Sequence, residues 1–359
     1  MPTTHRSTEG ADRENRAVTI AVQGVGLMGR QHIKAIQACP KAQLSALIDP
    51  TPQARDLARD LGVPHFPDLN ALPNDALPQA VIIATPNQLH EEHTCAAFER
   101  GLAVLIEKPI ADTVEAARRM ISAGERAGLP LLVGFHRRHS AVVCAAKARI
   151  EAGDLGKVVS MHATTWLFKP PAYFDAEWRK EKGAGPLGIN IVHDVDLMCF
   201  MAGPVRHALA MTSRATRQFE VEDTAAVILE FESGALGTLN LSDTIVAPWS
   251  YELTAGENPA YPMTAESSYL IGGTHGALDI PKARFWHNPE QRGWWENIES
   301  QPLDVTREDP LRRQIDHFCD VITGAAQPRV TGYDGLAAVA TLEAIARSAA
   351  SGARESVER

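Results

Sequence analysis

The chain has 359 residues, 45% hydrophobic and 22% charged, with a formal net charge of −9. A chain of this size can bury a substantial core, and its length favours two domains over one. The net negative charge argues against general nucleic-acid binding, which relies on many Lys and Arg side chains on one face. We therefore expect no nucleic-acid partner.

Cysteine usage and hydropathy indicate the cellular setting. The five cysteines stand singly without a CxxC pair, as in a cytoplasmic protein with reduced thiols. No apolar run is long enough to span a bilayer, so we expect no membrane partner. Residues 1–16 lack the apolar core of a secretory signal, and we interpret them as a disordered leader.

From residue 17, short apolar runs alternate with helical patterns. The runs are rich in Val, Ile and Leu with little polar alternation, as in strands covered on both faces. The predicted strands are 17–24, 43–49, 80–86, 103–109 and 129–135. The predicted helices are 28–39, 52–61, 88–100, 112–127 and 139–152. The pattern predicts a Rossmann domain over 17–137, an α/β fold with a doubly wound parallel sheet.

A glycine-rich turn, Gly-Val-Gly-Leu-Met-Gly, follows the first predicted strand and opens a helix. Gly24 permits the tight turn, Gly26 lets the backbone approach a pyrophosphate, and Gly29 lets helix and strand pack closely. The helix N-terminus favours an anion. The cofactor-binding residues expected here are Gly24, Gly26, Leu27, Met28 and Gly29.

An acidic residue indicates which dinucleotide binds. Asp49 ends the second predicted strand, twenty positions after Gly29, where a carboxylate accepts hydrogen bonds from a ribose 2′-hydroxyl. The same carboxylate repels a 2′-phosphate, so we expect NAD. NADP stays open, because Arg55 is near in sequence and such an Arg can accommodate the phosphate.

Two segments follow strand ends, where ligands bind in such sheets. Thr85, Pro86 and Asn87 are candidates to pack on the ribose or nicotinamide, or they form a turn in which Asn caps a helix. Lys108, in Glu-Lys-Pro, is expected to hydrogen-bond the reacting oxygen and stabilise alkoxide character, with Pro109 in the cis form. The alternative is that Lys108 pairs with Glu107 on the surface. The cofactor-binding residues expected at these strand ends are Thr85, Pro86, Asn87, His90, Glu107 and Lys108.

After about residue 155, β-type runs broken by Gly, Ser and Asp turns predict an α+β domain over 138–309 with a large, mostly antiparallel, open sheet. One helix is expected at 188–203 and ends at a Gly-Pro pair. The tail over 310–359 is helical and is expected to pack on both domains.

The helix predicted at 188–203 carries His193 as the proton acceptor, because its ordinary pKa near 6.5 suits transfer at neutral pH. Asn190 lies one turn earlier, and Asp194 and Asp196 are neighbouring carboxylates, one of which is expected to orient the ring. The alternative is a core histidine with satisfied hydrogen bonds.

Clustered histidines raise the alternative of a metal site. His90 and His93 bracket two glutamates, and His136 and His139 lie close in sequence. The first group lacks the i, i+4 histidine pair of zinc proteases, and hydride transfer to nicotinamide needs no metal. We expect no metal.

The residues together resemble the Gfo/Idh/MocA family of oxidoreductases. The segments that carry the resemblance are GVGLMG, ATPNQLH, EKP, GFHRRHS, GPLGINIVHDVDL and HFCDVITG. It implies a Rossmann domain, an α+β domain whose open sheet face forms a homodimer or homotetramer, Lys108 and His193 as the catalytic pair, and Asp196 as support for the helix. Many members carry Asp four residues before the histidine, where this chain has Ile189 beside Asn190.

Family substrates are mostly sugars, cyclitols and their acids, so the resemblance implies a small polar substrate. Several residues of the expected pocket are basic. They could bind a carboxylate or phosphate group of the substrate, or they are simply solvated surface charges. The expected substrate-binding residues are Asn190, Asp194, Arg138, Lys169, Tyr173, Trp178 and Arg179, with Arg137 and His275 as further pocket candidates.

Three functions follow from these features. The first is hydride transfer between nicotinamide and a secondary hydroxyl or ketone, with Lys108 and His193 handling the proton. The second is a redox-assisted hydrolase or a transhydrogenase with tightly held NAD. The third, a non-catalytic NAD-binding regulator, is disfavoured because both Lys108 and His193 are present.

Overall fold

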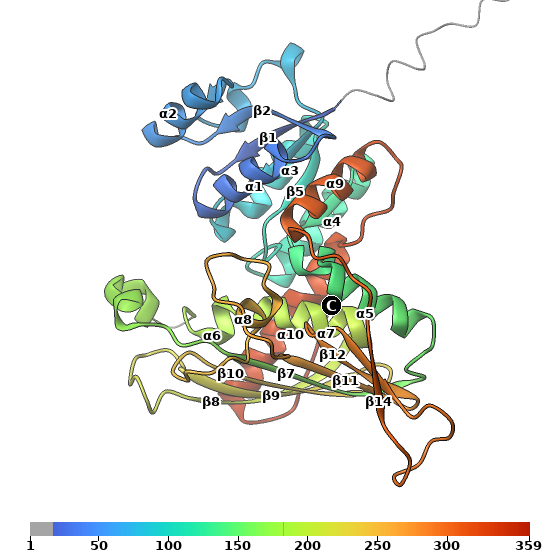
Figure 1. The fold of residues 1–359 in the computed structure, drawn as a ribbon. Helices are drawn as coiled ribbons and strands as arrows, with labels where there is room; N and C mark the ends of the chain where they lie inside the picture. Colours follow the sequence, from blue (N-terminus) through green and yellow to red (C-terminus); the bar gives the residue numbers. More distant parts are fainter. Residues whose placement is uncertain (1–16, 182) are drawn as a thin grey trace, which may run out of the picture. The chain divides into compact units, whose positions relative to one another are not determined.

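The computed structural model describes residues 17–181 and 183–359, so the leader expected over 1–16 lies outside it (Figure 1). The described chain divides into two compact units. The first holds the residues up to Glu107 together with Arg119–Gly134 and Leu311–Arg329. The second holds Lys108–Arg118, Phe135–Pro310 and Val330–Arg359.

The first unit is built on a six-stranded parallel sheet in the order β3-β2-β1-β4-β5-β6. Its central strands β1, β4 and β5 are almost wholly buried, which explains their unbroken apolar sequences. The two-residue strand β3 was not predicted. The strands are β1 Val18–Gln23, β2 Ala42–Ile48, β3 His65–Phe66, β4 Ala80–Ile83, β5 Ala103–Ile106 and β6 Leu131–Val133.

Helices connect these strands and match the predicted segments with small shifts at their ends. Thr51 caps α2, Pro52 is its first residue, and Gly62 ends it with a positive φ of 67°, as the sequence chemistry requires. The helices are α1 Leu27–Gln37, α2 Pro52–Leu61, α3 His90–Glu99 and α4 Val114–Ala127, with 3-10 turns η1 Leu69–Ala71, η2 Asn74–Ala76 and η3 Asn87–Leu89.

A helix from late in the sequence completes the first unit. Ile315, Phe318 and Cys319 of α9 (Pro310–Ile322) join the same buried cluster as Ile20 and Leu105 of the sheet. The predicted tail thus divides between the units, because α10 (Gly332–Ser351) belongs to the second.

The second unit is built on a nine-stranded sheet in the order β14-β13-β12-β11-β7-β10-β9-β8-β15. Its pairings are antiparallel except for β7 with β10. The strands are β7 Val158–Trp166, β8 Val205–Ser213, β9 Thr224–Phe231, β10 Leu236–Ser242, β11 Tyr269–Gly273, β12 Gly276–Ile280, β13 Arg284–His287, β14 Glu299–Pro302 and β15 Glu355–Ser356. This mostly antiparallel sheet confirms the predicted fold of the second domain.

Helices of the second unit lie on one face of this sheet (Figure 1). The segment predicted as one helix over 188–203 is two consecutive helices, α6 (Pro186–Ile189) and α7 (Ile191–Ala202). Pro186 starts the segment earlier because proline fits a first helical turn, and Gly203 ends it with a φ of 91°. The remaining helices are α5 Ala141–Glu151 and α8 Tyr251–Ala255, and the 3-10 turns are η4 His136–His139, η5 Pro171–Asp175 and η6 Glu177–Lys180.

The other face of the nine-stranded sheet exposes apolar side chains. Residues alternate along β8, where Ala208 and Ala210 are buried and Leu209 and Met211 are exposed, as the two-residue period of a strand requires. We call the exposed set the open face. Its apolar members are Val159, Leu209, Met211, Ile228, Leu236 and Leu270. None of the described helices combines the length and apolar content needed to cross a membrane.

Candidate functional site

The glycine-rich turn has the geometry that its sequence predicts. Gly24 has a φ of 87°, and a Cβ there would lie 2.6 Å from the Ala84 carbonyl oxygen. A Cβ on Gly29 would lie 1.9 Å from the Gly24 carbonyl oxygen. A Cβ on Gly26 would meet no atom within 4 Å, so this glycine leaves open space above the turn.

The start of α1 fits a bound pyrophosphate. Gly26 is the N-cap residue and offers no side chain to accept the first N–H groups, and the next side chain, Leu27, is 78% exposed. Unsatisfied N–H groups at a helix N-terminus bind anions. The residues present therefore fit a dinucleotide.

Asp49 lies beside this turn. Its Oδ2 accepts a hydrogen bond of 2.8 Å from the Val25 N–H, and its Oδ1 accepts two from Thr51, at 2.9 Å from the backbone N–H and 2.5 Å from the hydroxyl. Partial burial opposes ionisation, but these bonds outweigh it and lower the pKa of Asp49 below its usual value. Asp49 is therefore an anion at neutral pH, while Arg55 is exposed on α2.

Two histidines of α3 support the segment that follows β4. His90 is buried, and its Nε2 lies 2.9 Å from the Thr85 carbonyl oxygen, while His93 Nδ1 lies 3.1 Å from the Thr85 hydroxyl. His90 thus supports the loop, whereas Pro86 and Asn87 are exposed. Asn87 begins η3 and does not cap α3, so the expectation of an Asn cap was wrong: the extra 3-10 turn moves the start of α3 to His90.

Glu107 is buried against His32 rather than lying on the surface. Its Oε1 is 2.7 Å from His32 Nε2, and the side chain packs beside Gly134, where a Cβ would come within 3.2 Å of it. Sequence reasoning missed His32, although its place three residues after Gly29 puts it on the first turns of α1. Glu107 therefore anchors the end of β5, next to Lys108.

Lys108 follows Glu107, and the Lys108–Pro109 peptide bond is cis, as predicted. The chain enters the second unit at Lys108, so Lys108 and His193 belong to the same unit. The Lys108 side chain is half-buried.

His193 lies in the first turn of α7 and is only 9% exposed. Its ring contacts the ring of His136 edge-on at 5.1 Å, and Nδ1 is buried with no hydrogen-bond partner in the described part of the chain. Burial, followed by the positive charges of Lys108 and Arg137, lowers the pKa of His193 well below its usual value. The ring is therefore neutral at physiological pH, and Lys108 lies near enough to act on its charge.

Asn190 separates α6 from α7, three residues before His193. Its Oδ1 is buried without a hydrogen-bond partner. A buried acceptor without a donor costs roughly 1–3 kcal/mol, so two such atoms one helical turn apart indicate a place where ligand donors bind.

The Asp194 carboxylate is bound by other side chains of the second unit and does not share the surroundings of His193. Its Oδ1 is 2.8 Å from the Arg137 guanidinium and bonds to the Tyr269 hydroxyl, and its Oδ2 accepts a 2.9 Å bond from Thr165. Arg137 also bonds to Glu252 at 2.5 Å. The expectation that Asp194 binds substrate or orients the ring is therefore not supported, because both oxygens are already taken by β7, β11 and η4.

Arg138 is likewise used inside the protein. Its guanidinium forms two bonds to Asp196, of 2.7 and 3.0 Å, and a third of 2.9 Å to Asp334 at the start of α10. The side chain is 4% exposed, so it joins α7 to α10 and is not placed to receive substrate. Asp196 thereby supports the helix, as the resemblance implied.

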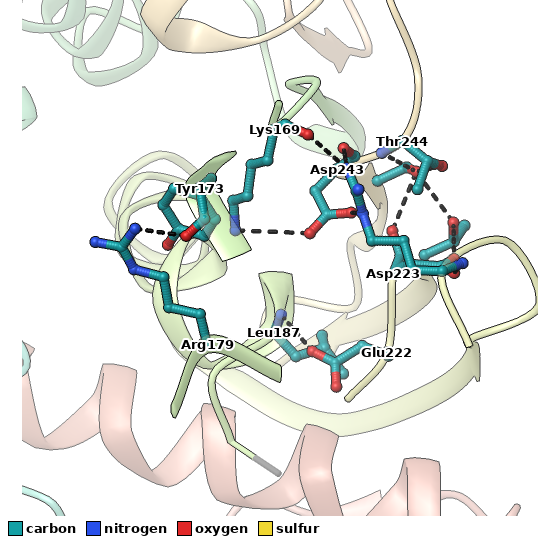
Figure 2. Close-up of polar contacts among 11 residues, drawn as sticks. Lys169, Tyr173, Arg179, Leu187, Glu222, Asp223, Asp243 and Thr244 are labelled. Atoms are coloured by element: carbon teal, nitrogen blue, oxygen red, sulfur yellow. Dashed lines mark hydrogen bonds and ion pairs between the residues drawn. The ribbon is translucent and has the colours of Figure 1, made fainter. Parts of the chain in front are cut away.

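The other expected substrate residues lie together in the segment before α6. Lys169 and Arg179 flank Tyr173, at 4.9 and 4.2 Å from its ring centre (Figure 2). Trp178 is 54% exposed, and the Arg179 guanidinium lies over its ring. Sequence reasoning missed two partners of this group, Arg217 and Asp243, because they come from later strands and loops.

A parallel sheet with a glycine-rich turn after its first strand and an acid after its second defines an NAD-binding Rossmann domain. The comparison with known families agrees. Residues 18–135 match the model described as "Oxidoreductase family, NAD-binding Rossmann fold", and residues 143–279 match "GFO/IDH/MocA C-terminal domain". The chain belongs to the Gfo/Idh/MocA family of oxidoreductases.

Relatives cover almost the whole chain. The scyllo-inositol 2-dehydrogenase (NAD(+)) of Bacillus subtilis is 27% identical over 328 residues, which are 88% of this chain and 90% of the relative. The 2,7-anhydro-N-acetylneuraminate hydratase of Mediterraneibacter gnavus is 24% identical and covers 93% and 95%. The crystal structure of the WlbA dehydrogenase from Bordetella pertussis in complex with NADH and UDP-GlcNAcA has a TM-score of 0.75 and 27% identity, covering 96% of this chain and all of that one.

Proposed function

We propose that the protein transfers a hydride between NAD and a secondary hydroxyl or ketone of a sugar, cyclitol or sugar-acid substrate. The observation that carries this proposal is that the Lys108 ammonium is near enough to lower the pKa of His193, whose buried Nδ1 has no partner. A cation and a neutral base beside one another are what an alcohol requires when it loses both a hydride and a proton.

The two side chains divide the proton chemistry. In the oxidation direction the neutral His193 ring accepts the hydroxyl proton, while Lys108 donates a hydrogen bond to the oxygen as negative charge develops there. In the reduction direction the protonated ring returns the proton to that oxygen. Asn190 Oδ1 accepts a hydrogen bond from a neighbouring substrate hydroxyl, in place of the acid that many relatives carry.

The first unit would hold the cofactor through Gly24, Gly26 and Gly29, the start of α1 and the Asp49 carboxylate. NAD supplies the hydride acceptor or donor, and the protein supplies binding, orientation and proton handling. Thr85, Pro86 and Asn87 form an exposed edge after β4 that suits packing on the nucleoside, while the buried His90 and Glu107 support that edge.

The relative named as a hydratase supports a redox-assisted reaction as a second candidate function. A redox-assisted mechanism of that kind needs the same hydride step, so it also depends on Lys108 and His193. Buried polar atoms without partners lower the free energy of unfolding, and a non-catalytic regulator offers no function that would offset this cost.

Turnover of polyols, inositols, aldoses and sugar acids with NAD or NADP, followed by cofactor absorbance, tests the proposal. Lys108→Ala is expected to lower kcat at least a hundredfold and to leave the Kd of NAD within threefold, because the ammonium acts mainly in the transition state. Lys180→Ala is the matched control, since Lys180 pairs with the nearby Glu177 and lies over the Phe219 ring, apart from Lys108. Undiminished turnover by Lys108→Ala would refute the role of Lys108.

We also propose that the open face joins copies of this chain into a dimer or tetramer. Its exposed apolar side chains lie on consecutive strands from β11 to β8, and contiguous apolar surface of this kind marks protein interfaces.

A further inference from the structure

Lys169 is a buried cation that has no hydrogen-bonded partner among residues 17–181 and 183–359. The residue is 8% exposed, and its Nζ is sealed from solvent without a hydrogen bond. The nearest carboxylate oxygen, Asp243 Oδ2, lies 3.8 Å away, beyond hydrogen-bond distance (Figure 2). Burial lowers the pKa of Lys169, and the attraction of Asp243 only partly restores it.

Arg179 presents a second unmatched donor on the other side of Tyr173. Its Nη1 donates a 2.6 Å bond to the Tyr173 carbonyl oxygen, but its Nε is buried without a partner. Both cations lie within 5 Å of the same ring centre, at 4.9 Å for Lys169 Nζ and 4.2 Å for the Arg179 guanidinium carbon. Tyr173 thus lies between two buried donors that have no acceptor among the described residues.

The carboxylates of this region are already satisfied. Asp243 Oδ1 accepts a 2.7 Å bond from Arg217, and Asp223 Oδ2 accepts bonds of 2.9 and 2.8 Å from the backbone N–H groups of Thr216 and Arg217. Glu222 accepts a 2.9 Å bond from the Leu187 N–H (Figure 2). These hydrogen bonds leave Lys169 Nζ without an acceptor among the described residues.

The cluster adjoins the helices that carry the reaction centre. Glu222, whose charge acts on Lys169, holds Leu187 at the start of α6, and α6 leads through Asn190 into α7 and His193. On the other side, Tyr173 lies near enough to Tyr261 to influence its pKa, as do Glu252 and Arg137 of the network behind Asp194. A small molecule bound at His193 thus has these donors within the same unit.

We propose that Lys169 binds a carboxylate of the substrate, so that the protein acts on a sugar acid. This deepens the proposed function and rests on it for the reaction. A monoanion suits the site better than a phosphate dianion, because three cations, Lys169, Arg179 and Arg217, face three carboxylates, Glu222, Asp223 and Asp243. The Lys169 ammonium forms a charge-assisted hydrogen bond with such a group.

The test uses the NAD-loaded protein with three matched probes: a uronate or aldonate, the neutral sugar alcohol or aldose of the same carbon skeleton, and the corresponding sugar phosphate. We expect the acid to exceed the neutral probe at least tenfold in kcat/KM. Lys169→Met should reduce this ratio at least tenfold through KM, Lys169→Arg should restore part of it, and Lys180→Met should leave it unchanged, because Lys180 pairs with Glu177.

Two further readouts separate this proposal from the proposed function and from a structural role. Calorimetric binding of the acid without any turnover would uphold the carboxylate site while overturning hydride transfer. Lys169→Met is expected to raise Tm, because it removes a buried cation while Asp243 keeps Arg217. A preference for the phosphate probe, an unchanged acid-to-neutral ratio in Lys169→Met, or a lowered Tm in that variant would each overturn the assignment.

Discussion

The Arg137 guanidinium and the Asp194 carboxylate form an ion pair of 2.8 Å in which both side chains are at most 4% exposed. The pair joins η4 to α7 directly beside His193. Because Arg137 has a second carboxylate, Glu252, whereas Asp194 has no second cation, the two partners do not depend on each other equally.

This asymmetry predicts unequal effects of removing either partner. Arg137→Met leaves a buried carboxylate with only hydroxyl donors and should lower the free energy of unfolding by about 3–5 kcal/mol. Asp194→Asn should cost less, because Arg137 keeps Glu252. Urea unfolding of both single variants and the double variant measures the coupling, with the exposed pair Arg59 and Asp56 as a control expected to contribute little. Equal losses from both single variants would contradict this account.

The glycine turn predicts that one substitution weakens NAD binding without affecting stability, whereas another lowers stability. Gly26→Ala meets no atom within 4 Å, so its Tm should stay near the wild-type value while the Kd of NAD rises at least tenfold. Gly29→Ala would place its Cβ 1.9 Å from the Gly24 carbonyl oxygen and should cost roughly 1–3 kcal/mol of stability. Thermal unfolding and NAD titration of the two variants check this, and an equally destabilised Gly26→Ala would count against the open space above the turn.

Asp49 predicts the choice of cofactor. Asp49→Ser should lower the ratio of kcat/KM for NAD over NADP at least tenfold, because it removes the charge that repels a 2′-phosphate. Thr51→Ala is the control, since it removes a neutral hydroxyl that donates to Asp49 and caps α2 but leaves the Asp49 carboxylate in place. An unchanged ratio in Asp49→Ser would show that another group sets the preference.

The lowered pKa of His193 predicts the pH dependence of the reaction and of stability. The base must be neutral, so alcohol oxidation should fall only as the pH drops below the usual 6.5, and His193→Gln should lose this acid limb together with roughly 10²–10⁴ in kcat. The unfolded chain binds the proton more readily than the folded one, so the contribution of His193 to stability is complete above about 6.5 and declines below it. An acid limb above 6.5 that His193→Gln removes would contradict a depressed pKa.

The open face predicts an oligomer that a single charged substitution on this face weakens. Met211, on β8 at one end of the open face, is 76% exposed, and Met211→Lys should shift the protein to a smaller species in light scattering at unchanged Tm per chain. Val246→Lys, 84% exposed outside the strands, is the control. A wild-type monomer at micromolar concentration would remove this interface from consideration.

The sequence predicted the two sheets well because their signals are local. Runs such as β4 and β5 are apolar throughout, and the glycine turn follows directly from a strand, so neighbouring residues alone specify them. The roles of Arg137 and Arg138 were not predictable in this way. Their partners lie 57 and 58 residues further along the chain. From the sequence alone, two adjacent arginines are expected to be solvent-exposed, because only the folded structure places these carboxylates beside them.

Helix α9 contributes Ile315 and Phe318 to the interior of the first unit, nearly two hundred residues after the last strand of its sheet. The nucleotide-binding half therefore cannot be excised with a single cut. A fragment of residues 17–135 would expose the apolar bed of α9 and should aggregate, whereas adding a peptide of residues 310–329 in trans should recover a soluble complex. Split at this helix, the protein would serve as a two-piece reporter whose reassembly depends on the 13 residues of α9.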